Sequence, residues 1–551
     1  MTDRDVAAGA GGQQRASAAA RAQGEPAVAR HRSQPGTGQP PAAASPAGPE
    51  QPGARGESWP ERAGLLLRRH WLFALVLTVG LVLRVLVQIA YNPALIYVDS
   101  LKYLFGTYPG SDPLGYDAVL KTVLPISNLS TVALLQHLLG LVMGVLIYLV
   151  LLRRGAPRWV AALAAAPVLL DGFELQMEHM IMPDVWFEGL VVIGFALLLW
   201  RPVVSAPFAI AAGLILGSSA TVRQIGELLI FPVVLYLLLA GGNWRRSLGT
   251  SVALIVAFAV PIVTYSSVSL AENGHFRLAR GQALTGRTAL AADCATLRLP
   301  PAARLICPTP AEQAIGADNL EHSGHSVIYS TPLPPGVSRA KVIGELRSAV
   351  LHQQPQRVAV SVLRDSVRLF TPIRRQQAVI TPISRWQFQP GYPNYPPWVR
   401  VNPSNGDIIL GVQRLAFHPF HFSVLKPTWG GKATVNRPVA KFLRFYQIHG
   451  GYTPGPLLAL CTLAGLAGSL LLLLRRVRRQ GSGRTRQLAL GCLLFSGTAV
   501  VVLLLPDVFE FSWRYQLPAT VTLAPAGFLG FAALLSFWRD RRSAGEPTTA
   551  S

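Results

Sequence analysis

The sequence predicts an all-α polytopic membrane protein with about ten transmembrane helices and a mixed extracytoplasmic domain. The mean hydropathy is +0.36, and only 14% of the 551 residues are charged, whereas soluble proteins carry about 25%. The apolar residues form long runs, and a helix needs about 20 of them to cross a bilayer. Many arginines lie at the ends of these runs, where they meet lipid headgroups. The formal charge of +23 therefore indicates a lipid bilayer as partner and no nucleic acid.

Ten apolar runs make up the predicted spans. They cover residues 71–90, 130–152, 159–172, 184–200, 206–222, 225–240, 248–270, 455–474, 488–506 and 516–538. Two of them, 159–172 and 225–240, reach spanning length only with flanking residues.

The spans divide the chain into five parts. We expect a disordered cytoplasmic tail at 1–62, an N-terminal transmembrane module at 63–270, an extracytoplasmic domain at 271–453, C-terminal transmembrane helices at 454–542 and a cytoplasmic tail at 543–551. The first tail has almost no large apolar residues, so it cannot offset the entropy cost of ordering.

Arginines predict which side of the membrane each loop faces. With the N-terminus inside, every strongly basic short loop falls on the cytoplasmic side, which is the positive-inside pattern. These loops hold Arg68 and Arg69, Arg153, Arg154 and Arg158, Arg201, Arg245 and Arg246, the RRVRRQGSGRTRQ segment and the closing RDRR segment. An even number of spans then predicts a multi-pass plasma-membrane protein with both termini in the cytoplasm.

Carboxylates gather in the loops predicted to lie outside. They are Asp99, Asp112 and Asp117 in the first loop, Asp171, Glu174, Glu178 and Asp184 in the second, and Asp507 and Glu510 in the last. Outer loops tolerate acids in general. Seven acids in two loops is nevertheless a high density for a chain this poor in charge, so these loops are the first place to look for a functional site.

Residues 271–453 are too long and too patterned to be a simple loop. The segments RAKVIGELRSAVLHQQ and PQRVAVSVLRDSVRLF have apolar residues at helical spacing, and Pro355 opens the second. The segment has 21 Lys and Arg against 8 Asp and Glu, a formal charge of +13. Contact with an anionic outer surface and recognition of a phosphate-bearing substrate both account for this charge.

Cysteines are few. Cys461 and Cys492 lie inside apolar runs and are expected to be buried. Cys294 and Cys307 lie close together in the polar segment. If this segment is outside the cell, we expect a disulfide between them; two free thiols are the alternative.

Three short motifs follow one another in a suggestive order. YVDSLKYL (97–104) follows the first span, LLDGFELQMEHMIMPDVWFEG (169–189) leads into the fourth, and SWRYQLPA (512–519) enters the last. Their order and sidedness resemble the GT-C superfamily of membrane glycosyltransferases, which transfer a sugar from a polyprenyl-phosphate donor on the non-cytoplasmic face. The resemblance covers residues 68–270 best, as a seven-helix module, with three further helices and an outer domain appended.

One segment and one departure refine this resemblance. GRTALAADCATLRLPPAARLICP (286–308), which contains both cysteines of the polar segment, looks like sequence from actinobacterial members. Many members carry Asp-Glu in the first loop, whereas this chain has Asp99-Ser100. Other members work with a single Asp.

The acids of the first two outer loops suit the chemistry that the resemblance implies. Asp99 is the expected general base, and an in-line displacement assisted by it would invert the anomeric centre. Glu178, His179 and Asp184 are expected to orient the acceptor, polarise Asp99 or bind a divalent cation, although their spacing matches no dedicated metal site. A loop-fixing role for Asp99 and a helix-capping role for Asp184 are the alternatives.

Four cations are candidates for the donor phosphate. Arg223 and Arg514 lie at the outer boundary, and the planar guanidinium suits phosphate oxygens. Arg84 lies inside the first span, where an arginine costs about 2.5–3.5 kcal/mol, with snorkelling to the interface as the alternative. Lys102 lies close to Asp99 in the YVDSLKYL motif.

The predicted function is transfer of a hexose or pentose from a polyprenyl-phosphate-linked donor to a glycan, lipid or protein acceptor. No Walker loop or dinucleotide fingerprint supports nucleotide use. A transporter or lipid flippase would show internal repeats and midplane charges, which the sequence lacks. A non-catalytic cell-envelope scaffold would leave the gathered carboxylates without a use.

Overall fold

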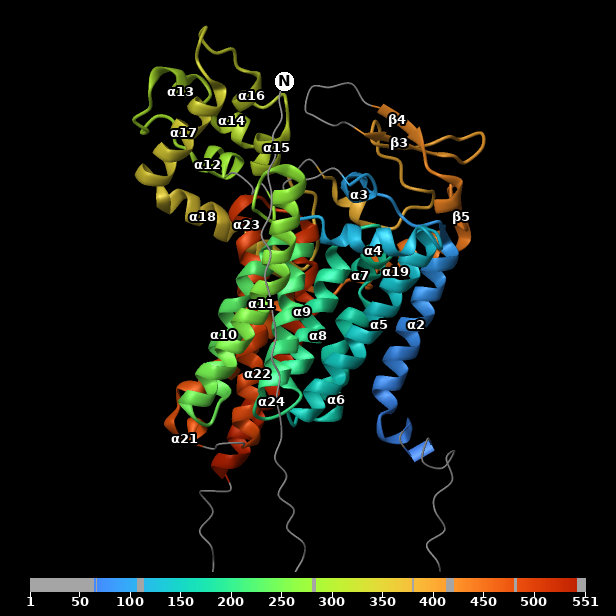
Figure 1. Cartoon of the computed structure of the whole chain (residues 1–551), viewed down its shortest axis with the longest axis vertical. Helices are drawn as coiled ribbons and strands as arrows, with labels where there is room; N and C mark the ends of the chain where they lie inside the picture. The colour runs from blue at the N-terminus through green and yellow to red at the C-terminus, as the bar shows by residue number, and fades with distance from the viewer. Residues whose placement is uncertain are drawn as a thin grey trace, which may run out of the picture. The chain divides into compact units, whose positions relative to one another are not determined.

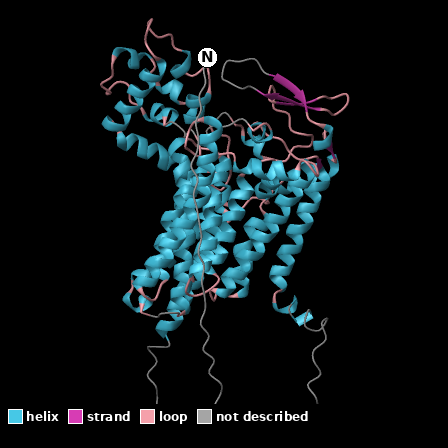
Figure 2. Cartoon of the chain, viewed as in Figure 1, coloured by secondary structure: helices cyan, strands magenta, loops and turns pink. Residues whose placement is uncertain are grey.

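A computed structural model describes residues 64–65, 67–106, 113–279, 284–378, 381–412, 421–479 and 483–542. The predicted tails at 1–62 and 543–551 fall wholly outside these residues, and so does Asp112. From Arg62 onward the chain folds as one compact unit, which is mainly helical (Figure 2).

Each of the ten predicted spans coincides with helix. Among the described residues, six helices are long and apolar enough to cross a membrane. They are α2 (Trp71–Ala90), α5 (Leu129–Arg153), α11 (Trp244–Asn273), α20 with η5 (Gly455–Leu473), α22 with η6 and α23 (Arg484–Phe509), and η7 with α24 (Trp513–Arg542). Helices α2, α11 and α20 expose many leucines and valines, as a lipid-facing surface requires.

The other predicted spans are shorter or broken. Helix α6 (Arg158–Leu170) bends by 53° into α7 (Gly172–Glu178), and this pair is at most a seventh span. The remaining helices are α8 (Asp184–Leu199), α9 (Ala206–Val222), η1 (Gln224–Leu229) and α10 (Ile230–Ala240). The predicted count of about ten spans is therefore not confirmed, because helix breaks at Asp171 and Arg223 shorten α6, α9 and α10.

The long helices run side by side in Figure 1. Helix α9 packs between α8 and α11, α5 packs on α6 and α8, and α24 packs on α20, α22 and α6. The last helices thus close back onto the first ones, although about 180 residues of polar segment separate them in the sequence.

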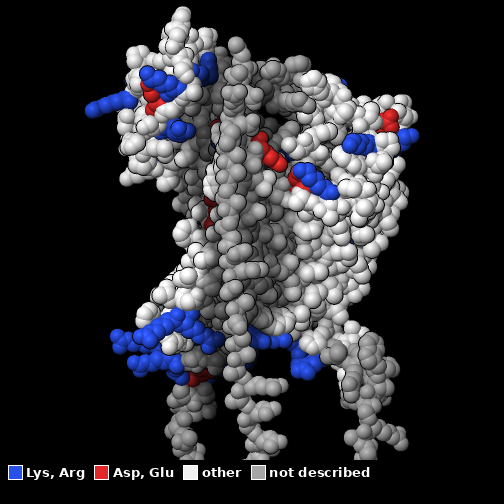
Figure 3. All heavy atoms as spheres, in the orientation of Figure 1, with Lys and Arg blue, Asp and Glu red and all other residues white. Residues whose placement is uncertain are grey.

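Loops predicted to be cytoplasmic meet at one end of this bundle. Arg154 donates from Nη2 to the Arg201 carbonyl at 3.0 Å, and Arg484 donates to the Gly155 carbonyl at 2.8 Å. Arg486 reaches the Leu239 carbonyl at 2.6 Å. Figure 3 shows Lys and Arg gathered at the end of the helices where α21 (Arg475–Arg478) lies in Figure 1. We call it the arginine-rich end.

The polar segment lies at the opposite end of the helices (Figure 1). Its helical elements are α12 (Thr285–Ala291), α13 (Pro301–Leu305), α14 (Pro310–Gln313), α15 (Gly316–His322), α16 (Val327–Ser330), α17 (Arg339–Gln353), α18 (Pro355–Ser366), η2 (Val367–Phe370), η3 (Ile383–Trp386), η4 (Pro427–Trp429) and α19 (Arg437–Ile448). The two helices predicted from apolar spacing are confirmed as α17 and α18, and Pro355 does open the second.

Two small sheets accompany these helices (Figure 2). Strands β2 (Val399–Val401), β3 (Ile408–Val412) and β4 (His421–Val424) form an antiparallel sheet in that order, with Leu410 opposite both Val399 and Ser423. Strand β1 (Tyr91–Asn92) pairs antiparallel with β5 (Thr434–Val435) and so ties the end of α2 to the polar segment.

Covalent and ionic links hold the rest of the polar segment. Cys294 and Cys307 form a disulfide with Cα atoms 6.0 Å apart, beside a small apolar core between α13 and α17. Arg287 on α12 is fully buried, pairs with Asp365 on α18 at 2.7 Å and donates to the Asp507 carbonyl of α23 at 2.6 Å. This arginine anchors the polar segment to a membrane helix.

A buried polar network joins α2, α5, α6 and α7. Glu178 accepts from Arg84 at 2.5 Å and contacts His137 Nδ1 at 2.8 Å, and His137 Nε2 lies 3.1 Å from His179 Nδ1. Arg84 also donates to the carbonyls of Val168 and Leu169. Because all of these side chains are almost fully buried, their mutual pairing is what makes their burial tolerable.

Gly140 on α5 makes room for this network. A Cβ there would overlap the Glu178 carboxylate and lie 2.7 Å from Arg84 Nη2. Gly140→Ala should therefore destabilise the protein by about 1–3 kcal/mol through overpacking, seen as a lower thermal unfolding temperature in detergent. Gly249→Ala on α11 is the matched control, because a Cβ there meets open space. Equal unfolding temperatures for the two variants would contradict the packing argument.

Candidate functional site

A short parallel pairing brings the first two acidic loops together. Leu95, just after α2, accepts a hydrogen bond from Ile181 at 3.0 Å and donates to the His179 carbonyl at 2.9 Å, so that it pairs with Met180. Asp99 and Asp184 each follow this pairing by four residues. Asp99 then precedes α3 (Ser100–Leu104), and Asp184 opens α8. Neither carboxylate caps its own helix.

Arg514 in η7 lies between these two carboxylates. Its Nη1 donates to Asp99 Oδ2 at 2.5 Å, its Nη2 donates to Asp184 Oδ2 at 2.9 Å, and its Nε lies 3.1 Å from Asp184 Oδ1. All three guanidinium nitrogens are therefore held by carboxylates. The arginine is buried, and it links the first, second and last loops of this end.

Arg223 completes the group from a fourth segment. Helix α9 ends at Val222, the backbone of Arg223 is extended, and η1 starts at Gln224. The close approach of η1 to the end of α9 requires glycine at position 226, because a Cβ there would lie 2.7 Å from the Ala220 backbone. Arg223 Nη1 pairs with Asp184 Oδ1. Its other N–H groups have no acceptor in the described part of the chain, and its side chain is 19% exposed.

The two acids differ in access. The Asp184 side chain is 4% exposed and is held by both arginines, so its charge is fully compensated. The Asp99 side chain is 35% exposed and is held through one oxygen only. Within the described residues, Asp99 Oδ1 has no hydrogen-bond partner. Asp184 is thus placed to position the arginines, and Asp99 is the accessible acid.

Aromatic residues of the polar segment cover the first loop. Tyr97 packs against Trp386 with ring centres 5.0 Å apart and against Tyr395 at 5.5 Å. The Tyr97 hydroxyl lies 3.1 Å from Thr381 Oγ1. Arg374 lies over the ring of Trp513, beside Arg514, at 5.7 Å. The polar segment therefore borders the site that Asp99 and Arg514 form.

The structure separates the predicted site residues into two groups. Asp99, Asp184, Arg223 and Arg514 come together. Glu178, His179 and Arg84 instead lie in the buried network described above, where they are paired with protein groups. Lys102 on α3 is half-buried, with its Nζ 5.2 Å from the centre of the Tyr103 ring.

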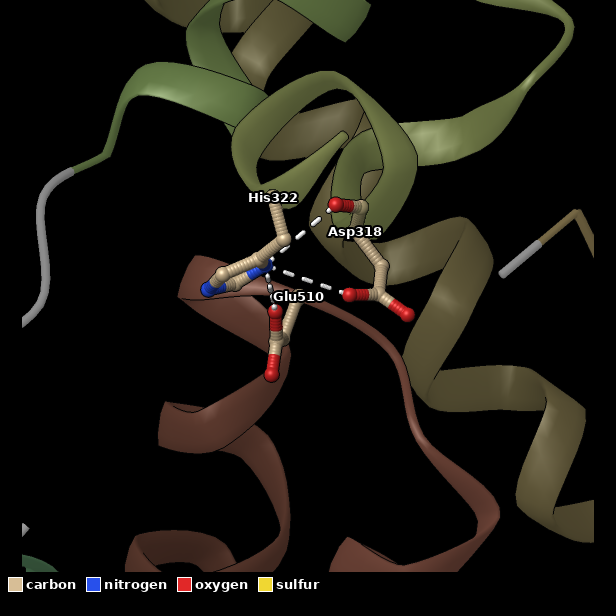
Figure 4. Close-up of side chains that lie close together, drawn as sticks. All are labelled: Asp318, His322 and Glu510. Carbon is tan, nitrogen blue, oxygen red and sulfur yellow. Dashed lines mark hydrogen bonds and ion pairs between the residues drawn. The ribbon is translucent and has the colours of Figure 1, made fainter. Parts of the chain in front are cut away.

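Two residues to which the sequence assigned no role in the site border it. Tyr515, next to Arg514, lies under the Arg223 guanidinium at 5.6 Å and donates from its hydroxyl to Glu510 Oε1 at 2.7 Å. Glu510 in turn faces His322 and Asp318 of α15 (Figure 4). Burial raises the pKa of Glu510 to about 7, and the hydrogen bond to Asp318 raises that of His322 to about 9.

A metal at the predicted acids finds no support in the geometry. Asp184 is not grouped with Glu178 and His179, and arginine joins Asp184 to Asp99. In the described part of the chain, the group of three side chains close enough to hold an ion is Asp318, His322 and Glu510.

Comparisons with known proteins give distant likenesses. No protein-family model matches the sequence, and no curated protein matches it. A crystal structure of ArnT from Cupriavidus metallidurans in the apo state has 12% identity and a TM-score of 0.27, covering 85% of this chain and 78% of ArnT. The same ArnT bound to undecaprenyl phosphate has 13% identity and a TM-score of 0.25, covering 84% and 77%.

Removing the central arginine should show how strongly the site is ionically coupled. Arg514→Met leaves Asp184 with one partner, and breaking a buried pair from one side costs about 3–5 kcal/mol. Asp99→Asn should cost about 0–1 kcal/mol, because this carboxylate is partly exposed. Thermal unfolding in detergent measures both. The double variant Arg514→Met with Asp184→Asn should recover part of the loss; if it is no more stable than Arg514→Met alone, the pairing is not what stabilises the site.

Proposed function

We propose that this protein is a membrane glycosyltransferase that moves a sugar from a polyprenyl-phosphate donor to an acceptor at the end opposite the arginine-rich end. The observation that carries this proposal is the ion-paired group at Asp99. It combines an accessible carboxylate, an arginine locked beside it and a second arginine with unused N–H groups. Such transfer needs a base for the acceptor and cations for the leaving phosphate.

The exposure of each side chain indicates its role in the transfer. The acceptor hydroxyl gives its proton to the free oxygen of Asp99, and its oxygen forms the new bond to the anomeric carbon. The bond from that carbon to the phosphate oxygen breaks, and the phosphate leaves with the electron pair. Arg223 stabilises the leaving phosphate through its unused N–H groups. Arg514 keeps Asp99 in place. Attack from the side opposite the phosphate inverts the anomeric centre.

An apolar cavity beside the site suits an apolar chain. It has a volume of about 170 Å³ and lies between η2, α20, α22 and η7. Its wall includes Leu369, Phe370, Leu466, Leu503 and Leu523, and it reaches Gln516, two residues from Arg514. A prenyl tail lodged near these residues would have its phosphate close to the boundary at which Arg223 and Arg514 lie.

The side of the membrane is part of the proposal. The positive-inside pattern favours a cytoplasmic arginine-rich end, which puts the termini inside and Asp99 on the outer face of the plasma membrane. The disulfide of the polar segment is consistent with an oxidising exterior. A divalent cation is not required by the roles given to the four residues.

Asp99→Asn should reduce transfer by about 10²–10⁴-fold, because the amide cannot accept the acceptor's proton. The measurement is incubation of purified protein with a panel of radiolabelled polyprenyl-phosphate sugars and envelope acceptors. Asp117→Asn on α4 (Gly115–Val123) is the control, because Asp117 pairs with the exposed Lys121 and not with the site. Retention of normal transfer by Asp99→Asn would remove this residue from the mechanism.

Arg223→Gln should weaken donor binding. A charge-assisted hydrogen bond contributes about 1.5–3 kcal/mol, so the donor dissociation constant should rise about 10–100-fold. Binding of a polyprenyl-phosphate in detergent measures this constant. Arg201→Gln at the arginine-rich end is the matched control and should leave the donor dissociation constant unaltered. If both variants bind the donor like the unaltered protein, the phosphate site lies elsewhere.

A further inference from the structure

We propose that Asp318, His322 and Glu510 form a binding site for one divalent metal ion of the Zn²⁺ type. The site joins α15 of the polar segment to the loop between α23 and η7 (Figure 4). It is separate from Glu178, His179 and Asp184, the residues for which the sequence suggested a divalent cation. The proposal does not depend on the proposed glycosyl transfer, because metal binding can be measured without substrate.

The spacing of the three ligand atoms fits a tetrahedral ion. His322 Nδ1 lies 3.2 Å from Asp318 Oδ1 and 3.4 Å from Glu510 Oε2. Ligands about 2.0–2.1 Å from Zn²⁺ at tetrahedral angles lie about 3.3–3.4 Å apart. The three atoms all lie within 4.8 Å of one another. An ion could therefore bind with small side-chain adjustments.

The ligand types and their origins also fit. Asp318 and His322 are one helical turn apart on α15, so they face the same side of the helix. Glu510 comes from a distant part of the chain and closes the group. One imidazole and two carboxylates are a ligand set that Zn²⁺ accepts, and the two negative charges balance the charge of the ion.

A neighbouring residue orients the third ligand. The Tyr515 hydroxyl donates to Glu510 Oε1 at 2.7 Å and leaves Oε2 facing His322. Such hydrogen bonds to the non-coordinating oxygen are typical of metal sites, and their loss weakens binding by about 10–100-fold. In the described structure, the Tyr515 ring also lies under Arg223, so the ion would be connected to the group around Asp99.

The site is accessible. The His322 side chain is 52% exposed, and Asp318 also lines a cavity of about 610 Å³ between α12, α15 and α18. Arg364 and Arg368 line the same cavity. With three protein ligands, a tetrahedral ion keeps one open position for water or another ligand.

The alternative is a protonated His322 paired with two carboxylates. Metal binding and this ion pair exclude each other at Nδ1, because an ion must displace the proton. The two interpretations therefore predict opposite results when metal is offered to the apo protein.

Metal titration of the full-length protein decides between them. The protein is purified in detergent with a tag free of histidine, treated with a chelator and desalted. Zn²⁺ binding is measured by elemental analysis, and Co²⁺ binding by its visible absorption, which is intense in tetrahedral sites. We expect about one ion per chain. His322→Gln and Glu510→Gln should abolish it. Tyr515→Phe should keep the stoichiometry and weaken affinity about 10–100-fold.

His352→Gln on α17 is the matched control. His352 is exposed and bonds only to Ser348 of its own helix in the described structure, so this variant should bind metal like the unaltered protein. Thermal unfolding of the metal-free variants shows whether each is folded. The proposal is overturned if the folded, unaltered protein binds no ion, or if folded His322→Gln retains the same ion and absorption.

Discussion

The pairing of Arg514 with two carboxylates from distant loops is the interaction on which the site depends. A lone guanidinium or carboxylate cannot lie buried at the end of an apolar helix bundle without a large desolvation cost. Each charge here is acceptable because the others are present. Arg514 thereby ties the last helix to the loops after the first and third predicted spans, and Arg223 adds the helix break after the fifth. Ion pairs thus join η7 to the loops of Asp99 and Asp184, which lie far from it in the sequence.

Two further groups of buried charges in this protein are also stabilised by mutual pairing. Arg84, Glu178 and the two histidines pair with one another in the interior and join four helices. Arg287 satisfies Asp365 and attaches the polar segment to α23. Around Asp99 and Arg223 the ion-paired side chains are also partly exposed, and one carboxylate oxygen and several N–H groups lack partners among the described residues. Exposure of unused hydrogen-bonding atoms, rather than incomplete pairing alone, distinguishes the group around Asp99 from the buried networks that hold helices together.

Much of this arrangement was accessible from the sequence because sidedness is a strong constraint. Hydropathy located all ten helical runs, and the position of acids and arginines relative to them selected Asp99, Asp184, Arg223 and Arg514. The desolvation cost of a charge could not separate these four residues from Arg84 and Glu178. Any arginine or acid near a membrane needs a partner, and which partner it finds depends on the packing of the helices. His322 escaped notice, and Glu510 was noted only as an acid of the last outer loop, because the chain brings the two together from distant segments.

The pairing of Leu95 with Met180 constrains which insertions and deletions this chain can accept during evolution. It acts as a common starting point from which two tetrapeptides run to Asp99 and Asp184. Gaining or losing a single residue in either tetrapeptide would swing one carboxylate away from the guanidinium of Arg514, whereas exchanging side chains at the intervening positions would leave the backbone path intact. The length of these stretches should accordingly be held more tightly in descendants than their composition.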